Sequence, residues 1–122
     1  MVLRSKRATG QQYEAVAEKY LISCGFSLIE RNFLAKGGEI DLIMRDGSTL
    51  VFVEVRYRKS QHYGHAAETV TRSKINKLIK AANMWLLNNG LSVYSTDFRF
   101  DLVAIHQQGE QVEWIKNAIT QG

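Results

Sequence analysis

Apolar and polar residues alternate along this chain with two periodicities, one typical of helices and one typical of strands. An apolar stripe at helical spacing follows Thr9 and Gln12, which form a capping pattern, and predicts a helix over about 10–24 that ends at Gly25. A second stripe lies between Thr71, a suitable N-cap, and Gly90, and predicts another helix. Its apolar members are Ile75, Leu78, Ile79, Ala82 and Leu86.

Segments that alternate with a period of two residues predict strands at 26–33, 39–45, 50–58 and 98–106, and a short edge strand at 111–115. Asp46 and Gly47 form a hairpin turn signal between the second and third strands. The order α-β-β-β-α-β predicts an α/β fold with a mixed sheet flanked by helices. We expect one domain over residues 1–122, with a flexible basic arm at 1–8 and a core over about 9–116.

Composition narrows the classes of partner and site. The chain has 16 Lys and Arg against 12 Asp and Glu, and its net charge of +4 suits a polyanionic partner such as nucleic acid. No apolar run approaches the roughly 20 residues of a membrane helix, and the N-terminus lacks a signal-peptide core, so a cytoplasmic protein without membrane contact is expected. Cys24 is the single cysteine, and one cysteine excludes an internal disulfide and a multi-cysteine zinc site. We expect it on the inner face of the first helix.

The hairpin between the second and third strands carries clustered acids. Strict alternation places Glu39, Asp41 and Ile43 on one face of the second strand, with Ile40, Leu42 and Met44 on the other. On the third strand Phe52, Glu54, Arg56 and Arg58 share one face, and Val51, Val53, Val55 and Tyr57 share the other.

Hairpin register decides whether the two charged faces meet. A two-residue turn at Asp46 and Gly47 sets Asp41 opposite Phe52, and a four-residue turn through Thr49 sets Asp41 opposite Glu54. Both registers bring the acids to one face, whereas an odd loop length separates them. Neighbouring carboxylates repel each other and attract a hard cation, so Asp41 and Glu54 are candidate ligands of Mg²⁺ or Mn²⁺.

The alternative reading is an ordinary solvated hairpin face, on which alternating charges are common. Ile43 and Phe52 share the predicted face with the acids, which favours a face that is partly covered. Covered carboxylates need a partner, and this supports the cation hypothesis.

Several motifs together resemble a known nuclease group. Gly38-Glu39-Ile40-Asp41-Leu42-Ile43 followed by Val51-Phe52-Val53-Glu54-Val55-Arg56 resembles the D...ExK core of the PD-(D/E)XK superfamily, which has a restriction-endonuclease-like fold. The opening helix, with Gly10, Glu14, Ala17, Leu21, Gly25 and Phe26, is similar to that of archaeal Holliday-junction resolvases. Over about residues 8–106 the chain most resembles the bacterial YraN-type family, an uncharacterised group placed in that superfamily.

The resemblance implies roles for individual residues. It makes Asp41 and Glu54 ligands of Mg²⁺ or Mn²⁺, with the Val55 carbonyl as a third ligand, and Glu14 the acid contributed by the helix. Glu39 is an additional ligand or a group that positions water. For Glu14, an exposed first-turn acid favoured by the helix dipole is an equally good reading.

Arg56 departs from the superfamily pattern, which has lysine at this position. Arginine stays protonated and cannot act as a base, although it can hold a phosphate. Lys74, at the start of the second helix, is a candidate for the missing amine. A weakened or lost activity is the other interpretation of Arg56.

Further basic residues are candidates for phosphate contacts, although each alone is also typical of a solvated surface. They are Arg58, Lys59, Lys77 and Lys80. The sequence therefore predicts a metal-dependent endonuclease acting on DNA, with branched or repair intermediates as candidate substrates and a homodimer as a candidate assembly on a two-fold junction. The alternatives are a non-catalytic nucleic-acid-binding module on a degenerate nuclease core, and a protein-interaction subunit that binds an acidic partner through its basic helix.

Overall fold

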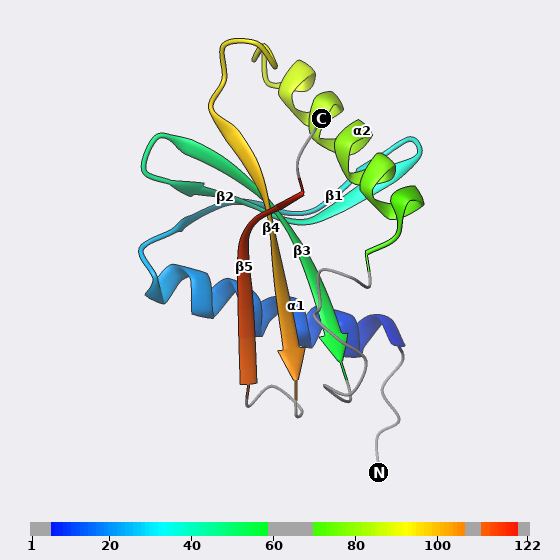
Figure 1. Cartoon of the computed structure of the whole chain (residues 1–122), viewed down its shortest axis with the longest axis vertical. Helices are drawn as coiled ribbons and strands as arrows, with labels where there is room; N and C mark the ends of the chain where they lie inside the picture. The colour runs from blue at the N-terminus through cyan, green and yellow to red at the C-terminus, as the bar shows by residue number, and fades with distance from the viewer. Residues whose placement is uncertain (1–5, 59–69, 107–110, 120–122) are drawn as a thin grey trace.

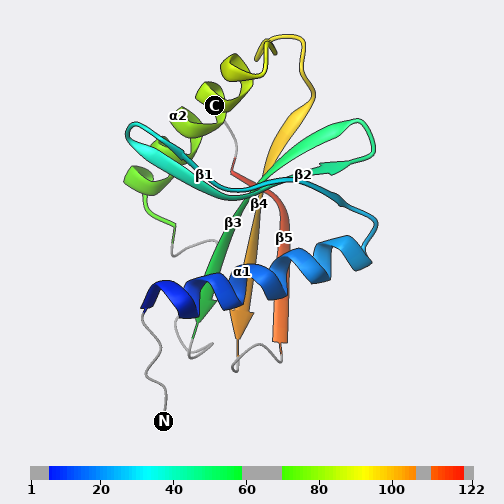
Figure 2. The same ribbon diagram turned by 180° about the vertical axis from the view of Figure 1, so that it is seen from behind.

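The structure is a computed structural model that describes residues 6–58, 70–106 and 111–119. A five-stranded sheet in the order β1-β2-β3-β4-β5 forms its centre, and a helix covers each face (Figures 1 and 2). The elements in chain order are α1 (Lys6–Ser23), β1 (Ser27–Ala35), β2 (Gly38–Asp46), β3 (Thr49–Arg58), α2 (Arg72–Asn88), β4 (Phe98–His106) and β5 (Gln111–Ile119). This arrangement confirms the α/β prediction with its α-β-β-β-α-β core, and β5 is the edge strand expected after that core.

The sheet is mixed because of one crossover. Strands β1, β2 and β3 pair antiparallel as consecutive neighbours, β3 and β4 pair parallel, and β5 returns antiparallel to β4. The parallel pair needs a long connection, which contains α2. Since α2 runs along one face and α1 along the other, the two helices bury opposite sides of the strands (Figures 1 and 2).

Two apolar clusters separate the faces. The α2 side contains Ile40, Ile43, Leu50, Phe52, Leu78, Ala81, Ala82, Trp85, Leu86, Phe100 and Ile119. The α1 side contains Ala17, Leu21, Phe26, Leu42, Met44, Val51, Val53, Val103 and Ile105. Burying apolar area on both sides of the sheet is the main stabilising contribution to such a fold, at about 25 cal/mol per Å².

Helix boundaries differ from the prediction at the first helix. α1 begins at Lys6, so Thr9 lies inside the helix rather than at its N-cap, and residues 6–8 of the expected flexible arm are helical. The helix ends at Ser23, and Cys24 is exposed beyond it rather than on the inner face. The N–H of Phe26 bonds back to the carbonyl of Leu21, and this tight turn carries Cys24 away from the core.

The second helix agrees with the prediction. Thr71 is the N-cap of α2, and its hydroxyl accepts a hydrogen bond from the backbone N–H of Lys74 at 3.1 Å. Gly90, with φ of 68°, follows the last turn. Neither described helix has the length and apolar character required to cross a membrane.

A buried carboxylate on β4 stabilises the pairing of β4 with the edge strand β5. Asp101 is fully buried and accepts hydrogen bonds from Arg99 Nε at 3.0 Å, from Trp114 Nε1 at 3.0 Å and from the backbone N–H of Asn117 at 2.9 Å. These donors satisfy the charge at a register shift between β4 and β5. Strand β5 consequently extends to Ile119, four residues beyond the predicted edge strand at 111–115.

Candidate functional site

The candidate site lies where β2 separates from β3. Their ladder runs from Asp46 opposite Thr49 to Leu42 opposite Val53, which is the register that sets Asp41 opposite Glu54. The predicted turn differs slightly, since Asp46 and Thr49 pair and leave the two-residue Gly47-Ser48 loop. Past Leu42 the strand pairing ends, and the fork between the two strands holds both acids.

A side chain replaces the ladder at this point. The backbone N–H of Val55 donates a hydrogen bond of 2.9 Å to Asp41 Oδ2 instead of to a β2 carbonyl. The Asp41 carboxylate is therefore held between the strands, with one of its two oxygens committed to the backbone of β3.

Strict alternation along β2, predicted from the sequence, is wrong near Asp41. Ile40 and Ile43 both belong to the cluster on the α2 side, while Leu42 and Met44 face α1. Residues three apart share a face only where the pleat is interrupted, so the interruption lies beside Asp41. It removes this aspartate from both faces and aims it into the fork.

Asp41 and Glu54 form a buried acidic pair. They are 8% and 4% exposed, respectively. Burial first, and then the neighbouring Asp41 carboxylate, raise the pKa of Glu54 from 4.5 to about 8. A pair of this kind is a strong attractor for a cation, since a cation relieves both the repulsion and the desolvation.

Lys74 partly balances the pair from α2. Its Nζ lies 3.4 Å from Glu54 Oε2, and this ammonium opposes the rise in the pKa of Glu54. Glu54 Oε2 is buried without a hydrogen-bond partner. The contact of this oxygen with Lys74 is an ion pair without hydrogen-bond geometry, so a metal-bound water or a cation can supply the interaction that it lacks.

Glu14 joins the site from α1. Burial first, and then repulsion by Asp41, raise the pKa of Glu14 to about 7. A hydrogen bond from Asn32 opposes this rise by favouring the carboxylate, and Glu39 contributes further repulsion. The helix-borne acid of the sequence analysis is thus half-buried beside Asp41 rather than a solvated first-turn residue.

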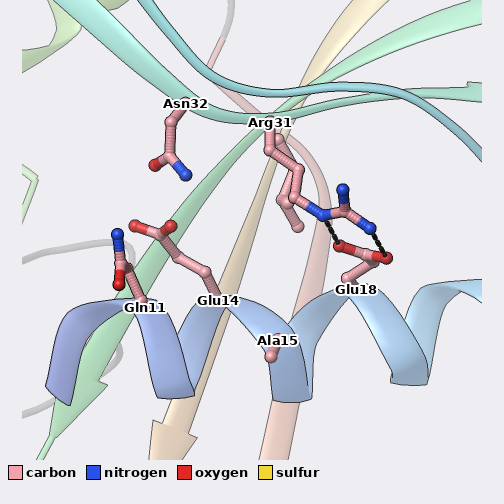
Figure 3. A pocket seen from close by; sticks show the side chains of 7 residues that line it. Gln11, Glu14, Ala15, Glu18, Arg31 and Asn32 are labelled. Atoms are coloured by element: carbon pink, nitrogen blue, oxygen red, sulfur yellow. Dashed lines mark hydrogen bonds and ion pairs between the residues drawn. The ribbon is translucent and has the colours of Figure 1, made fainter. Parts of the chain in front are cut away.

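A groove continues from Glu14 between α1 and the β1–β2 hairpin. It has a volume of about 510 Å³ and is lined by Gly10, Gln11, Glu14, Asn32, Leu34 and Glu39. A smaller hollow of about 210 Å³ adjoins it through Gln11, Glu14 and Asn32, and extends to Glu18, Arg31 and Leu42. Figure 3 shows Gln11 and Glu14 on α1 and Asn32 on β1 pointing toward one another across one end of this hollow, and the ion pair of Arg31 with Glu18 at the other end.

Gln11 and Asn32 are site residues that sequence reasoning missed. Asn32 adopts φ of 52° within β1, a left-handed conformation that asparagine tolerates better than most residues. Arg31 pairs with Leu42 and Phe33 with Ile40, so Asn32 lies opposite Asp41. An asparagine inside an otherwise apolar and charged strand was the one available signal, because asparagine is depleted in strands.

The other predicted site residues lie on the hairpin, on β3 and on α2, as far as the structure describes them. Glu39 is exposed on the hairpin, and Lys77 and Lys80 are exposed on α2. Arg56 is partly buried on β3, on the same face as Glu54. Lys59 and the side chain of Arg58 lie outside the described residues.

Close packing fixes the hairpin end against α2. A Cβ added to Gly38 would lie 2.3 Å from the backbone oxygen of Lys77, so glycine is needed at this position. The contact sets the distance between the β1–β2 hairpin and the helix that carries Lys74.

The donor set of the fork is suited to a hard cation. Two buried carboxylates, one orphaned oxygen and the neighbouring backbone suit a hard cation such as Mg²⁺, which prefers one or two carboxylates together with water and substrate oxygens. Within the described ranges, no group of three acidic, histidine or cysteine side chains is placed to hold a metal ion, so the protein's side-chain ligands here are at most the two carboxylates. The donors present fit an open site, in which water or other oxygen ligands complete the coordination of a cation.

Comparison with known proteins gives one family. Residues 13–105 match the model of the uncharacterised protein family UPF0102. A UPF0102 protein of Vibrio cholerae is 57% identical over 122 residues, covering 100% of both chains. A relative in Vibrio campbellii is 52% identical over 122 residues, which cover 100% of both chains. A relative in Aliivibrio salmonicida is 55% identical over 118 residues, which cover 97% of this chain and 96% of the relative.

Proposed function

The chain belongs to the uncharacterised protein family UPF0102, and on this premise we propose that it is a divalent-metal-dependent nuclease that hydrolyses DNA phosphodiester bonds. The observation that carries the proposal is the buried Asp41–Glu54 pair in the fork between β2 and β3. Acid pairs at the end of a β-hairpin, followed by a basic residue two positions on, are the pattern of the PD-(D/E)XK superfamily, to which we assign the chain.

The residues that would hold the cation are Asp41 and Glu54, with the Val55 carbonyl beside them. Asp41 Oδ2 already accepts the N–H of Val55, which orients the aspartate and leaves its other oxygen for the metal. When bound, Mg²⁺ or Mn²⁺ supplies charge neutralisation at the phosphate and a lower pKa for an attacking water. Glu39 lies further out and is assigned to the positioning of water.

The protein's own cations complete the site. Lys74 holds its ammonium 3.4 Å from Glu54, where it favours the ionised carboxylate needed for metal binding and can donate a hydrogen bond to a phosphate oxygen. Lys74 thereby provides the amine that Arg56 does not. The planar guanidinium of Arg56 is suited to hold the charge that develops on the phosphate, rather than to remove a proton.

DNA contacts beyond the reacting phosphate are assigned to the exposed lysines of α2, Lys77 and Lys80, and to Arg58 and Lys59. Lys77 and Lys80 follow Lys74 by about one and two turns of α2, as expected for contacts to phosphates that flank the scissile one. Branched and repair intermediates are the proposed substrates, in keeping with the resolvase-like opening helix.

A cleavage assay tests the proposal. Single-stranded, duplex and branched oligonucleotides are incubated with wild-type protein and Mg²⁺ or Mn²⁺, beside Asp41→Ala and Glu54→Ala. We expect each substitution to lower the cleavage rate by about 100-fold or more, while DNA binding without metal changes little. Asp97→Ala is the matched control, since it removes an exposed carboxylate that bonds Thr49 near the hairpin turn, at the far end of β3.

Two results would overturn the proposal. One is cleavage that Asp41→Ala and Glu54→Ala leave unchanged, because the activity would then belong to another protein in the preparation. The other is metal-independent DNA binding with no cleavage of any oligonucleotide, which would support a binding module on a degenerate nuclease core. Arg56 in place of the usual lysine is the observation that favours this second candidate.

A further inference from the structure

The groove beside the acidic pair has features that the cleavage proposal does not use. It runs between the first turns of α1 and the β1–β2 hairpin, and reaches Glu14, the neighbour of Asp41. Its volume of about 510 Å³ falls in the range of small-molecule sites, about 300 to 1,000 Å³. A chemical group seated there would lie next to whatever is bound between Asp41 and Glu54.

The charge of the groove selects against a phosphate. Glu14 and Glu39 line it, and the ion pair of Glu18 with Arg31 in the adjoining hollow adds no net positive charge. The only arginine of that lining, Arg31, is neutralised by a bidentate pair with Glu18 at 2.6 and 2.9 Å. An uncharged group with hydrogen-bonding edges suits this lining better than an anion.

Two amides give the groove such edges. Gln11 on α1 and Asn32 on β1 face the same hollow from opposite walls (Figure 3). Each amide carries a donor and an acceptor side by side, the arrangement with which asparagine and glutamine bind nucleobases, and the contact of Asn32 with Glu14 orients its amide in the groove. Leu34, which is exposed, gives an apolar surface for the flat face of a ring.

Asn32 is placed in the groove at a conformational cost. Its φ of 52° lies within β1 opposite Asp41, and a left-handed non-glycine residue inside a strand is uncommon. Such conformations concentrate at binding sites, where the surrounding structure maintains them. Asparagine at this position therefore provides a side chain that the strand itself does not require.

We infer that this groove receives an unpaired nucleobase of the DNA strand whose phosphate lies at the Asp41–Glu54 pair. The inference rests on the proposed function and specifies its substrate class. A base inside a duplex cannot reach Gln11 and Asn32 without leaving its stack. The substrate is consequently single-stranded, or carries unpaired bases at a fork, gap or branch.

Binding without metal tests the inference separately from cleavage. The full chain is titrated in EDTA at pH 6, where Glu14 and Glu54 are mostly protonated and repel DNA less. The probes are a single-stranded oligonucleotide and its duplex, each with one 2-aminopurine. We expect the single strand to bind about tenfold more tightly, with a change in 2-aminopurine fluorescence.

The variants are Gln11→Ala and Asn32→Gly. Glycine adopts the φ of Asn32 without strain, so Asn32→Gly deletes the amide and preserves the fold. Each variant should weaken single-strand binding by about three- to tenfold and leave duplex binding unchanged. Asn117→Gly is the matched control, because Asn117 has φ of 55° on β5 and does not line the groove.

Each outcome bears on one claim. Equal binding of single strand and duplex, or single-strand binding that Asn32→Gly leaves unchanged, overturns the inference. A loss of Mn²⁺ binding in both variants with unchanged single-strand binding also overturns it, because the groove would then be a cation subsite. If one of these results is found together with cleavage that depends on Asp41, the groove inference fails and the proposed function stands. Base binding that depends on Gln11 and Asn32 without cleavage leaves the groove inference and removes the nuclease.

Discussion

Asp41 accepts the backbone N–H of Val55 at 2.9 Å, so a side chain closes the ladder between β2 and β3 where the strands part. The bond orients Asp41 relative to the strand that carries Glu54. It also explains how two acids remain neighbours in an environment that is almost dry, because at least one oxygen of the pair is satisfied by the backbone.

Without divalent metal, the free energy of unfolding should fall as the pH rises from about 5 to 8. The folded-state pKa values of Glu14 and Glu54, about 7 and about 8, lie above the ordinary value of 4.5, so the folded state binds more protons than the unfolded state across this interval. The stabilising effect of these protons is complete below about pH 4.5 and disappears as the pH passes the folded pKa values. Urea denaturation in EDTA at several pH values measures it.

Mg²⁺ or Mn²⁺ should reverse this dependence. Metal binding requires ionised carboxylates, so the stabilisation by added cation should grow as the pH rises toward 8.

Replacing Glu54 by Gln should raise metal-free stability at pH 8 by about 1 to 2 kcal/mol, because the neutral amide no longer repels Asp41. A metal-free stability that stays flat or rises between pH 5 and 8 would contradict the raised pKa values.

Lys74→Met should move metal binding to higher pH. The ammonium 3.4 Å from Glu54 opposes the rise in the carboxyl pKa, so its removal raises that pKa further. At pH 7 we expect about tenfold weaker Mn²⁺ binding by calorimetry, recovered in part at pH 9. Lys77→Met is the control, since Lys77 is exposed on the same helix. Unchanged Mn²⁺ affinity at both pH values would show that Lys74 does not influence metal binding by Glu54.

Gly38→Ala should destabilise the fold by about 2 to 4 kcal/mol. The new Cβ would lie 2.3 Å from the carbonyl oxygen of Lys77, and a backbone atom cannot move aside cheaply. Gly10→Ala is the matched control, because a Cβ there meets nothing within 4 Å and alanine favours the helix by about 1 kcal/mol. Thermal or urea unfolding of the two variants should therefore shift in opposite directions.

Asp101→Ala should cost about 3 to 5 kcal/mol of stability. The substitution leaves Arg99 without its buried partner and removes the acceptor of the Trp114 indole and the Asn117 N–H. Trp114 fluorescence should shift as its surroundings loosen, which reports the β4–β5 edge directly. A variant with wild-type unfolding would show that the network contributes little.

Much of the fold follows from local patterns in the sequence. The strand Phe98–His106, the N-cap at Thr71 and the stripe of α2 depend on neighbours within a few residues, and the structure has them as predicted. The hairpin register follows from a short turn and two alternating strands, so the meeting of Asp41 with Glu54 was also within reach of the sequence. These features involve periodicity and short-range geometry alone.

Tertiary structure decided the rest. The interruption of the pleat beside Asp41, the left-handed Asn32 and the placement of Glu14 and Lys74 on either side of the fork arise where separate segments meet. The exposure of Cys24 and the anchoring of β5 on Asp101 likewise depend on how distant segments pack. Periodicity describes what a strand or helix does by itself, whereas a ladder that ends in a side-chain bond requires a partner that the local sequence does not contain.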